Sequence, residues 1–176
     1  MKILTQMSEE FDTAQNEMRT LLERVRSAVL ASVDSKAQPL SSYAPVWVDD
    51  DRRFHVYISS LAKHTSQIKR SGLASVMIIE DESEADNLFA RKRLTVDCRV
   101  EVVDRNTEDW EATMGRMEKR LGETVSSLKG LTDFDLIRLI PSEGRLVLGF
   151  GRAYRLFGSG LREFGYIGGG GHQSKQ

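Results

Sequence analysis

The sequence has a single cysteine, few prolines and no long apolar run. Its one cysteine, Cys98, excludes a disulfide within the 176-residue chain, which fits a reducing compartment. No segment approaches the roughly 18 apolar residues of a membrane span. The N-terminus turns acidic after a few residues and lacks the apolar region of a signal peptide. We therefore expect a cytoplasmic protein with no membrane partner.

An excess of either charge is also missing. The chain has 26 acidic and 25 basic residues and a net charge of −1, so its composition does not indicate nucleic acid as a partner. The sequence contains no P-loop, no CxxC pair, no HExxH and no GxSxG, the motifs of several common enzyme classes. Its length and its 40% hydrophobic content suit a single globular domain over residues 1–176.

Hydrophobic periodicity predicts the α+β class. Apolar residues at helical spacing predict an amphipathic helix over about residues 1–26. About seven strands follow, with two more helices: one closed by Gly72 and one capped by Asn106 or Thr107. Cys98 falls on an alternating strand and is expected to be a core residue. Short connections predict antiparallel pairing, and a sheet this large is expected to close into a small barrel with flanking helices.

The three histidines differ in what their surroundings predict. His55 alternates outward on a strand and is expected at the surface or an interface. His64 opens a short helix beside Lys63 and Thr65, where backbone N–H groups attract anions; a capping or solvent-facing role fits equally well. His172 follows four glycines, which cannot specify a structure. Either this tail, within a flexible segment 158–176, has no role, or it delivers an imidazole to a site that the folded body does not reach alone.

Charged residues near two strand starts are further candidates. Arg91 and Arg93 are expected to share a strand face, with Lys92 on the other, and two guanidiniums on one face can bind phosphate or carboxylate. The acidic run before them, "EDESEAD", equally allows a neutralised surface. Asp133 is expected to begin a strand, where an acid is commonly part of a turn.

Together, "SSYAPV", "ISSLAKHTSQI", "IEDESEADNLFARKRLTVD" and the ending "GFGRAYRL…GGGH" resemble the haem-utilisation family of HugZ and HutZ type. This family is part of the pyridoxamine-phosphate-oxidase-like, FMN-binding split-barrel superfamily. The resemblance runs from about Ala28 to His172. It implies a homodimeric split barrel that binds haem near the dimer interface and breaks the macrocycle to release iron.

The resemblance also implies roles for individual residues. His172 is the axial ligand of the haem iron, and Arg93 is the distal arginine. His64 and Asp133 fall near the subunit interface, where a carboxylate can fix the tautomer of an imidazole. The sequence offers no second electron carrier, so an external electron donor or reductase is expected as a partner, and a haem-delivery protein is a further candidate.

Two alternatives remain open at this stage. An FMN-binding oxidoreductase could hold the flavin phosphate with side chains of these regions: Ser59, Ser60, Lys63, Thr65, Arg91 and Lys92. A haem carrier would use the same axial ligand without turnover. In all three cases we expect a homodimer, formed through a sheet face that carries apolar residues in need of cover: Val46, Trp47, Val56 and Ile58.

Overall fold

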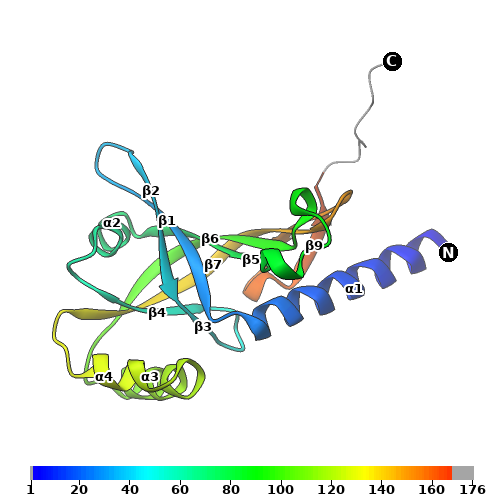
Figure 1. The fold of residues 1–176 in the computed structure, drawn as a ribbon. Helices are drawn as coiled ribbons and strands as arrows, with labels where there is room; N and C mark the ends of the chain where they lie inside the picture. Colours follow the sequence, from blue (N-terminus) through cyan, green and yellow to red (C-terminus); the bar gives the residue numbers. More distant parts are fainter. Residues whose placement is uncertain (1, 168–176) are drawn as a thin grey trace.

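The computed structural model describes residues 2–167, which form one antiparallel sheet with four α-helices (Figure 1). The helices are α1 (Lys2–Arg24), α2 (Lys63–Ser71), α3 (Glu108–Leu121) and α4 (Glu123–Lys129). The strands are β1 (Ser27–Val33), β2 (Pro39–Pro45), β3 (Trp47–Val48), β4 (Phe54–Ser59), β5 (Leu73–Ile79), β6 (Arg93–Val103), β7 (Phe134–Gly149), β8 (Arg152–Phe157) and β9 (Glu163–Tyr166). Short 3-10 turns are η1 (Glu82–Glu84), η2 (Leu88–Ala90) and η3 (Ser159–Leu161). The α+β prediction is confirmed.

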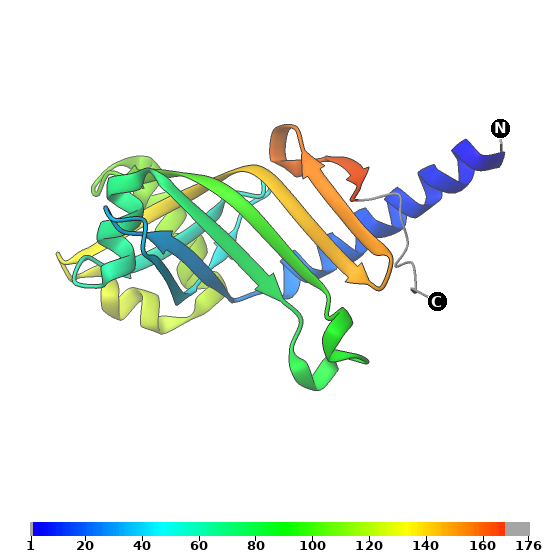
Figure 2. The ribbon, with the colours of Figure 1, turned by 90° about the horizontal axis from the view of Figure 1, so that it is seen from above.

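The strand order is β2-β1-β5-β6-β7-β4-β3, and β8 and β9 extend the sheet from β7. Figure 2 shows β5 to β8 running side by side across the molecule. All pairs are antiparallel, as the short connections predict. Strands β6 and β7 are long and lie at the centre of the sheet. Their pairing extends from Arg93–Val147 to Val103–Leu136.

The main core lies on the inner side of this sheet. Every second residue of the central strands is buried there, including Leu30, Val76 and Val96, and α1 covers them with Ala14 and Met18. Cys98 is in this core, and burial raises the pKa of its thiol to about 12. The prediction that Cys98 is a core residue is confirmed, and the neutral thiol is not a nucleophile at neutral pH.

A second core forms on the opposite side of the sheet, beneath α3 and α4 (Figure 1). Tyr57 and Leu136 point outward from β4 and β7 and pack against Trp110 of α3. The predicted cap of α3 is confirmed: the Thr107 hydroxyl accepts a hydrogen bond from the Trp110 N–H at 3.2 Å. Gly72 ends α2 with φ 68°, also as predicted.

Several boundaries differ from the sequence-based expectation. The stretch 40–48, expected as one strand, is divided between two pairings, because residues up to Pro45 pair with β1 whereas Trp47 and Val48 pair with β4. The two strands expected over 134–141 and 145–157 are divided differently. Strand β7 runs through residues 134–149, with a register shift that leaves Ser142 unpaired next to Pro141, and β8 forms the rest of the second predicted strand. Helix α4 and strand β9 were not predicted.

The prediction of a flexible segment over residues 158–176 is wrong for the first part of that segment. Residues 159–161 form η3, and β9 pairs with β8 from Tyr154–Tyr166 to Phe157–Glu163. His172 and the glycines before it lie outside the described residues.

The four residues expected to need cover from a second subunit are covered within the chain. Val46, Val56 and Ile58 are at most 5% exposed in the main core, and Trp47 packs beside α3 in the second core. This choice of interface residues was wrong, because strand alternation alone does not reveal which faces the helices cover. In residues 2–167, no helix is long and apolar enough to span a membrane.

Candidate functional site

The basic segment before β6 is largely committed to neighbouring groups. Arg91 donates to the carbonyl of Glu80 at 3.1 Å and to the carboxylate of Glu82 at 2.9 Å. Lys92 forms an ion pair with Glu17 of α1 at 3.0 Å. These contacts fix the η1–η2 connection and α1 to the start of β6, so Arg91 does not form a free fork with Arg93.

Arg93 is the uncommitted cation of this segment. Its Nη1 donates to the carbonyl of Arg91 at 3.0 Å, and no ion pair within residues 2–167 neutralises it. Arg93 stands on the outer side of the sheet, where its register neighbours are Ile79 and Val147. A half-buried guanidinium between two aliphatic side chains is suited to bind an anionic group.

The outer side of β1, β2 and β5 is an apolar surface. We call it the outer face; its residues are Val29, Ala31, Val33, Tyr43, Leu73, Met77 and Ile79. Tyr43 and Leu73 are 66% and 59% exposed. In register, Val29 lies between Tyr43 and Met77. This surface is continuous with Arg93 through the Ile79–Arg93 pair.

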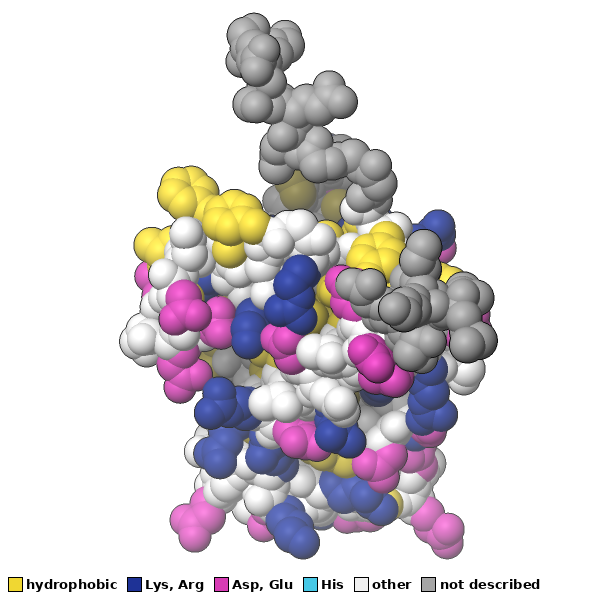
Figure 3. All heavy atoms as spheres, turned by 90° about the vertical axis from the view of Figure 1, so that its right-hand side faces the viewer, with side chains coloured by type: hydrophobic (Ala, Val, Ile, Leu, Met, Phe, Trp, Pro, Cys, Tyr) yellow, Lys and Arg dark blue, Asp and Glu magenta, His cyan; other side chains and the backbone are white. Residues whose placement is uncertain are grey.

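The end of the sheet that carries Arg93 is also apolar at its rim. Leu88 and Phe89 of η2 are 64% and 88% exposed, and Phe150 in the β7–β8 turn is 68% exposed. Figure 3 shows exposed hydrophobic side chains gathered at this end of the molecule.

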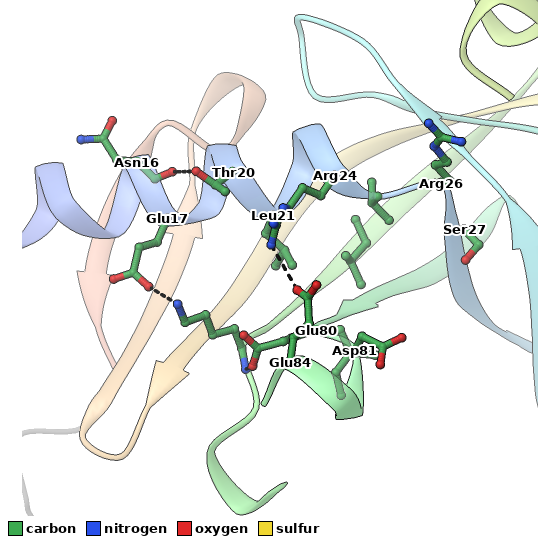
Figure 4. Close-up of a pocket in the computed structure, with 14 residues that line it drawn as sticks. Asn16, Glu17, Thr20, Leu21, Arg24, Arg26, Ser27, Glu80, Asp81 and Glu84 are labelled. Atoms are coloured by element: carbon green, nitrogen blue, oxygen red, sulfur yellow. Dashed lines mark hydrogen bonds and ion pairs between the residues drawn. The ribbon is translucent and has the colours of Figure 1, made fainter. Parts of the chain in front are cut away.

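A pocket of about 630 Å³ lies between α1 and the ends of β5 and β6 (Figure 4). Some of its charges are paired: Lys92 pairs with Glu17, and Arg24 pairs with Glu84 at 3.2 Å. Burial opposes the charge of Glu17, but hydrogen bonds from Arg152 and Lys92 outweigh it and lower the pKa of Glu17. These ion pairs hold α1 on the sheet, and the four acidic and three basic side chains of the lining give the pocket a net charge of −1.

Asp133 lies beside the loop that leads into α2 and His64. The two side chains form no hydrogen bond with each other among the described residues. Nε2 of His64 is buried without a partner among these residues, and burial lowers the pKa of His64. Asp133 accepts a bond from the Ser59 hydroxyl at 3.4 Å, and its carbonyl accepts one from the Ser60 N–H. Burial thus favours the neutral imidazole of His64, whose Nε2 is enclosed among residues of its own chain.

The remaining predicted residues of this region differ in accessibility. Thr65 is buried, and its hydroxyl donates to the carbonyl of Ser59 at 2.6 Å, so it holds the loop before α2. Lys63 is exposed.

Arg93 lies at one end of the sheet, and His64 and Asp133 lie at the opposite end. Arg93 pairs with Val147 at one end of β6, whereas Val103 pairs with Leu136, next to Asp133, at the other. Ten residue steps along a strand separate these ends by about 30 Å. A single chain therefore does not assemble Arg93, His64 and Asp133 into one site.

His55 was expected at the surface or an interface, but it is buried within the chain. It is 1% exposed, and its Nε2 lies 2.9 Å from Oδ2 of Asp49. Alternation did place it on the outer side of β4, beside Arg138 in register. However, Trp47 stacks on its ring and α3 lies above, where Asp109 binds Arg138 at 2.7 Å. Asp49, which organises this cluster, carried no local signal beyond its place in a polar turn.

Comparisons with known proteins decide the family. The pyridoxamine 5′-phosphate oxidase family matches residues 14–148. The chain is 39% identical over 151 residues to the heme oxygenase HutZ of Vibrio cholerae serotype O1, covering 86% of this chain and 85% of HutZ. The chain belongs to the pyridoxamine 5′-phosphate oxidase family, in the branch of HutZ. The resemblance inferred from the sequence motifs is confirmed.

Solved structures agree with this assignment. The crystal structure of HutZ from Vibrio cholerae, described as a heme storage protein, superimposes with a TM-score of 0.71 at 37% identity, covering 77% of this chain and 94% of that one. Campylobacter jejuni ChuZ gives a TM-score of 0.83 at 26% identity over 94% of this chain and 66% of ChuZ. The predicted split-barrel fold is confirmed by these HutZ-type structures.

Proposed function

We propose that this HutZ-type protein is a homodimeric enzyme that binds haem between its subunits and degrades it oxidatively to release iron. One observation carries the proposal: Ile167, where the chain leaves the sheet, lies in the same row of cross-strand neighbours as Arg93. Ile167 donates to Ala153 at 3.0 Å, Ala153 pairs with Val147, and Val147 pairs with Arg93.

The segment between Ile167 and His172 is long enough to reach Arg93. Three strand spacings separate Ile167 from Arg93, a distance of about 14 Å. The five residues 168–172 can span at most about 17 Å when extended. Neutral imidazole is a common proximal ligand of haem iron, which supports His172 as the axial ligand.

The residues around Arg93 fit haem. The macrocycle is flat and apolar with anionic propionates, and this end offers exposed Leu88 and Phe89 beside an unpaired guanidinium. Haem, when bound, supplies the activation of oxygen and is itself the substrate. Arg93 stabilises negative charge that develops in the reaction without giving up its own proton.

The second subunit completes the site. Two copies packed antiparallel through the outer face place the Arg93 end of one chain beside the His64 end of the other. Asp133 then acts as a positioning residue that fixes the tautomer and orientation of an imidazole. Lys63 remains available for a propionate, whereas Thr65 and Arg91 contribute by holding their loops.

Catalysis is favoured over storage by the similarity to a heme oxygenase, HutZ, which is 39% identical over 86% of this chain. The free cation alone does not separate the two functions, because a carrier could use Arg93 to bind a propionate. An external reductase must supply electrons, and a haem-delivery protein is a candidate partner. FMN is less well supported than haem, because Arg91 and Lys92, two of the groups suited to its phosphate, are paired with carboxylates.

The decisive experiment adds hemin to the purified protein and then ascorbate in air. We expect a Soret band on binding, its decay after ascorbate, and iron that a chelator can capture. A Soret band that persists after ascorbate contradicts the enzyme and supports a carrier, and a preparation that is yellow with flavin contradicts both.

Arg93→Ala is expected to slow haem degradation by about 100-fold while haem affinity changes little. The reason is that a distal cation acts on charge present in the transition state more than on the resting complex. Single-turnover decay of the Soret band measures the rate, and hemin titration measures the affinity. Arg155→Ala removes an exposed arginine paired with Glu143 and serves as the control; a normal rate in Arg93→Ala contradicts the assigned role.

Val29→Glu is expected to convert the dimer to a monomer. This residue is central in the outer face, between Tyr43 and Met77, and an unpaired carboxylate in an apolar interface is strongly unfavourable. Light scattering gives the mass of each variant. Leu131→Glu places the same charge on an exposed loop residue and should leave the dimer intact. A wild-type protein that is monomeric at micromolar concentration rejects the interface site.

A further inference from the structure

A second polar pocket lies between η3 and the start of β4. Its volume is about 470 Å³. The lining includes three guanidinium groups, a hydroxyl and one carboxylate: Arg53, Arg99, Arg162, Ser159 and Asp51. Arg99 lies six residues along β6 from Arg93, about 20 Å away, so this pocket is separate from the proposed axial-ligand end of the haem site.

The positive charges of this pocket are only partly neutralised. Arg53 binds Asp49 at 2.7 Å and Asp51 at 3.4 Å. Neither Arg99 nor Arg162 forms an ion pair with any carboxylate of residues 2–167. Many other arginines on this surface are paired, among them Arg145 and Arg155. Two unneutralised guanidiniums therefore line the same small volume.

A fourth arginine holds the wall of the pocket in place. Arg52 donates to the carbonyls of Gly160 and Leu161 at 3.0 and 2.7 Å. Gly160 has φ 61°, in the left-handed region that favours glycine, so the bond stabilises a sharp turn. Burial and the nearby charge of Arg162 lower the pKa of Arg52. The loop is thus preformed, and an anion in the pocket would relieve repulsion between these cations.

We propose that this pocket binds a small molecule that carries phosphate groups. Guanidinium groups match phosphate oxygens with paired N–H donors, and the Ser159 hydroxyl can add another. The volume exceeds that of one phosphate group, so the ligand has room for a second phosphate or an attached polar group. Leu73 lies beside Arg99 in register, so the pocket borders the outer face.

The test uses the full-length protein without haem, so its result does not depend on the proposed enzyme activity. Inorganic phosphate, inorganic pyrophosphate and citrate are titrated separately at low ionic strength by calorimetry. We expect pyrophosphate to bind more tightly than phosphate, because it engages both Arg99 and Arg162. Arg99→Gln with Arg162→Gln should lower the affinity for pyrophosphate by about tenfold or more.

Matched controls separate a specific site from general electrostatics. Arg145→Gln with Arg155→Gln removes the same charge from paired, exposed positions and should leave pyrophosphate affinity unchanged. Circular dichroism and the melting temperature verify that each double variant is folded. Undetectable pyrophosphate binding, equal losses in both double variants, or citrate binding as tightly as pyrophosphate overturns the proposal. A pocket variant that fails to fold is replaced by Arg99→Lys, which keeps the charge, loses the paired donors, and is expected to weaken pyrophosphate binding several-fold.

Discussion

Replacing His172 with alanine is expected to abolish haem degradation and to weaken ferric haem binding by about 100-fold or more. Loss of the axial ligand removes a direct bond to iron, which contacts to the macrocycle do not replace. The Soret band should also shift, because its position depends on the axial ligand. Hemin titration followed by absorption spectroscopy measures both effects, and ascorbate in air measures degradation.

Two truncations test whether the tail acts only by carrying this ligand. A chain that ends at Ile167 should behave like His172→Ala, because both lack the imidazole. A chain that ends at His172 keeps the ligand and loses only residues 173–176, so it should bind and degrade haem normally. If the chain ending at Ile167 binds hemin with the native spectrum, the axial role of His172 is rejected and an FMN-binding protein becomes the better hypothesis.

Asp49→Ala is expected to lower the free energy of unfolding by about 3 kcal/mol. The carboxylate of Asp49 accepts bonds from the buried His55 ring, from the Arg53 guanidinium and from the backbone of the β3–β4 turn. Removing it leaves His55 buried without its partner and releases the turn. Chemical denaturation measures the change. Asp51→Ala is the control in the same turn, because its side chain is 69% exposed and its removal should cost less than about 0.5 kcal/mol.

The same carboxylate predicts a dependence on pH. Burial alone would raise the pKa of Asp49, but hydrogen bonds from His55 and Arg53 lower it far below its ordinary value of 3.8. A depressed pKa stabilises the folded protein above the ordinary value, and this contribution is lost as the pH falls below it. The wild-type protein should thus lose stability more steeply below about pH 4 than Asp49→Ala does. Equal slopes for the two proteins contradict this interpretation.

Local chemistry in the sequence determined most of the elements. The α1 helix followed from its apolar spacing, the end of α2 from Gly72, and the cap of α3 from Thr107. Alternation on β6 placed Cys98 in the core. These predictions hold because capping, left-handed glycine conformations and side-chain alternation depend on a few neighbouring residues. Four motifs spread along the chain, one of them around Arg93, together indicated the family.

Only the tertiary structure decided which faces are covered and which charges are free. His55 and Arg93 both point to the outer side of the sheet, yet α3 buries His55 and leaves Arg93 accessible. Arg91 and Arg93 are two residues apart, yet only Arg91 meets the acidic groups of η1. The long pairing of β6 with β7 separates Arg93 from Asp133, and the return of the chain through η3 assembles the second arginine pocket. Each outcome depends on contacts between segments distant in sequence, and the free energy of such contacts is set by packing and charge pairing that no local pattern encodes.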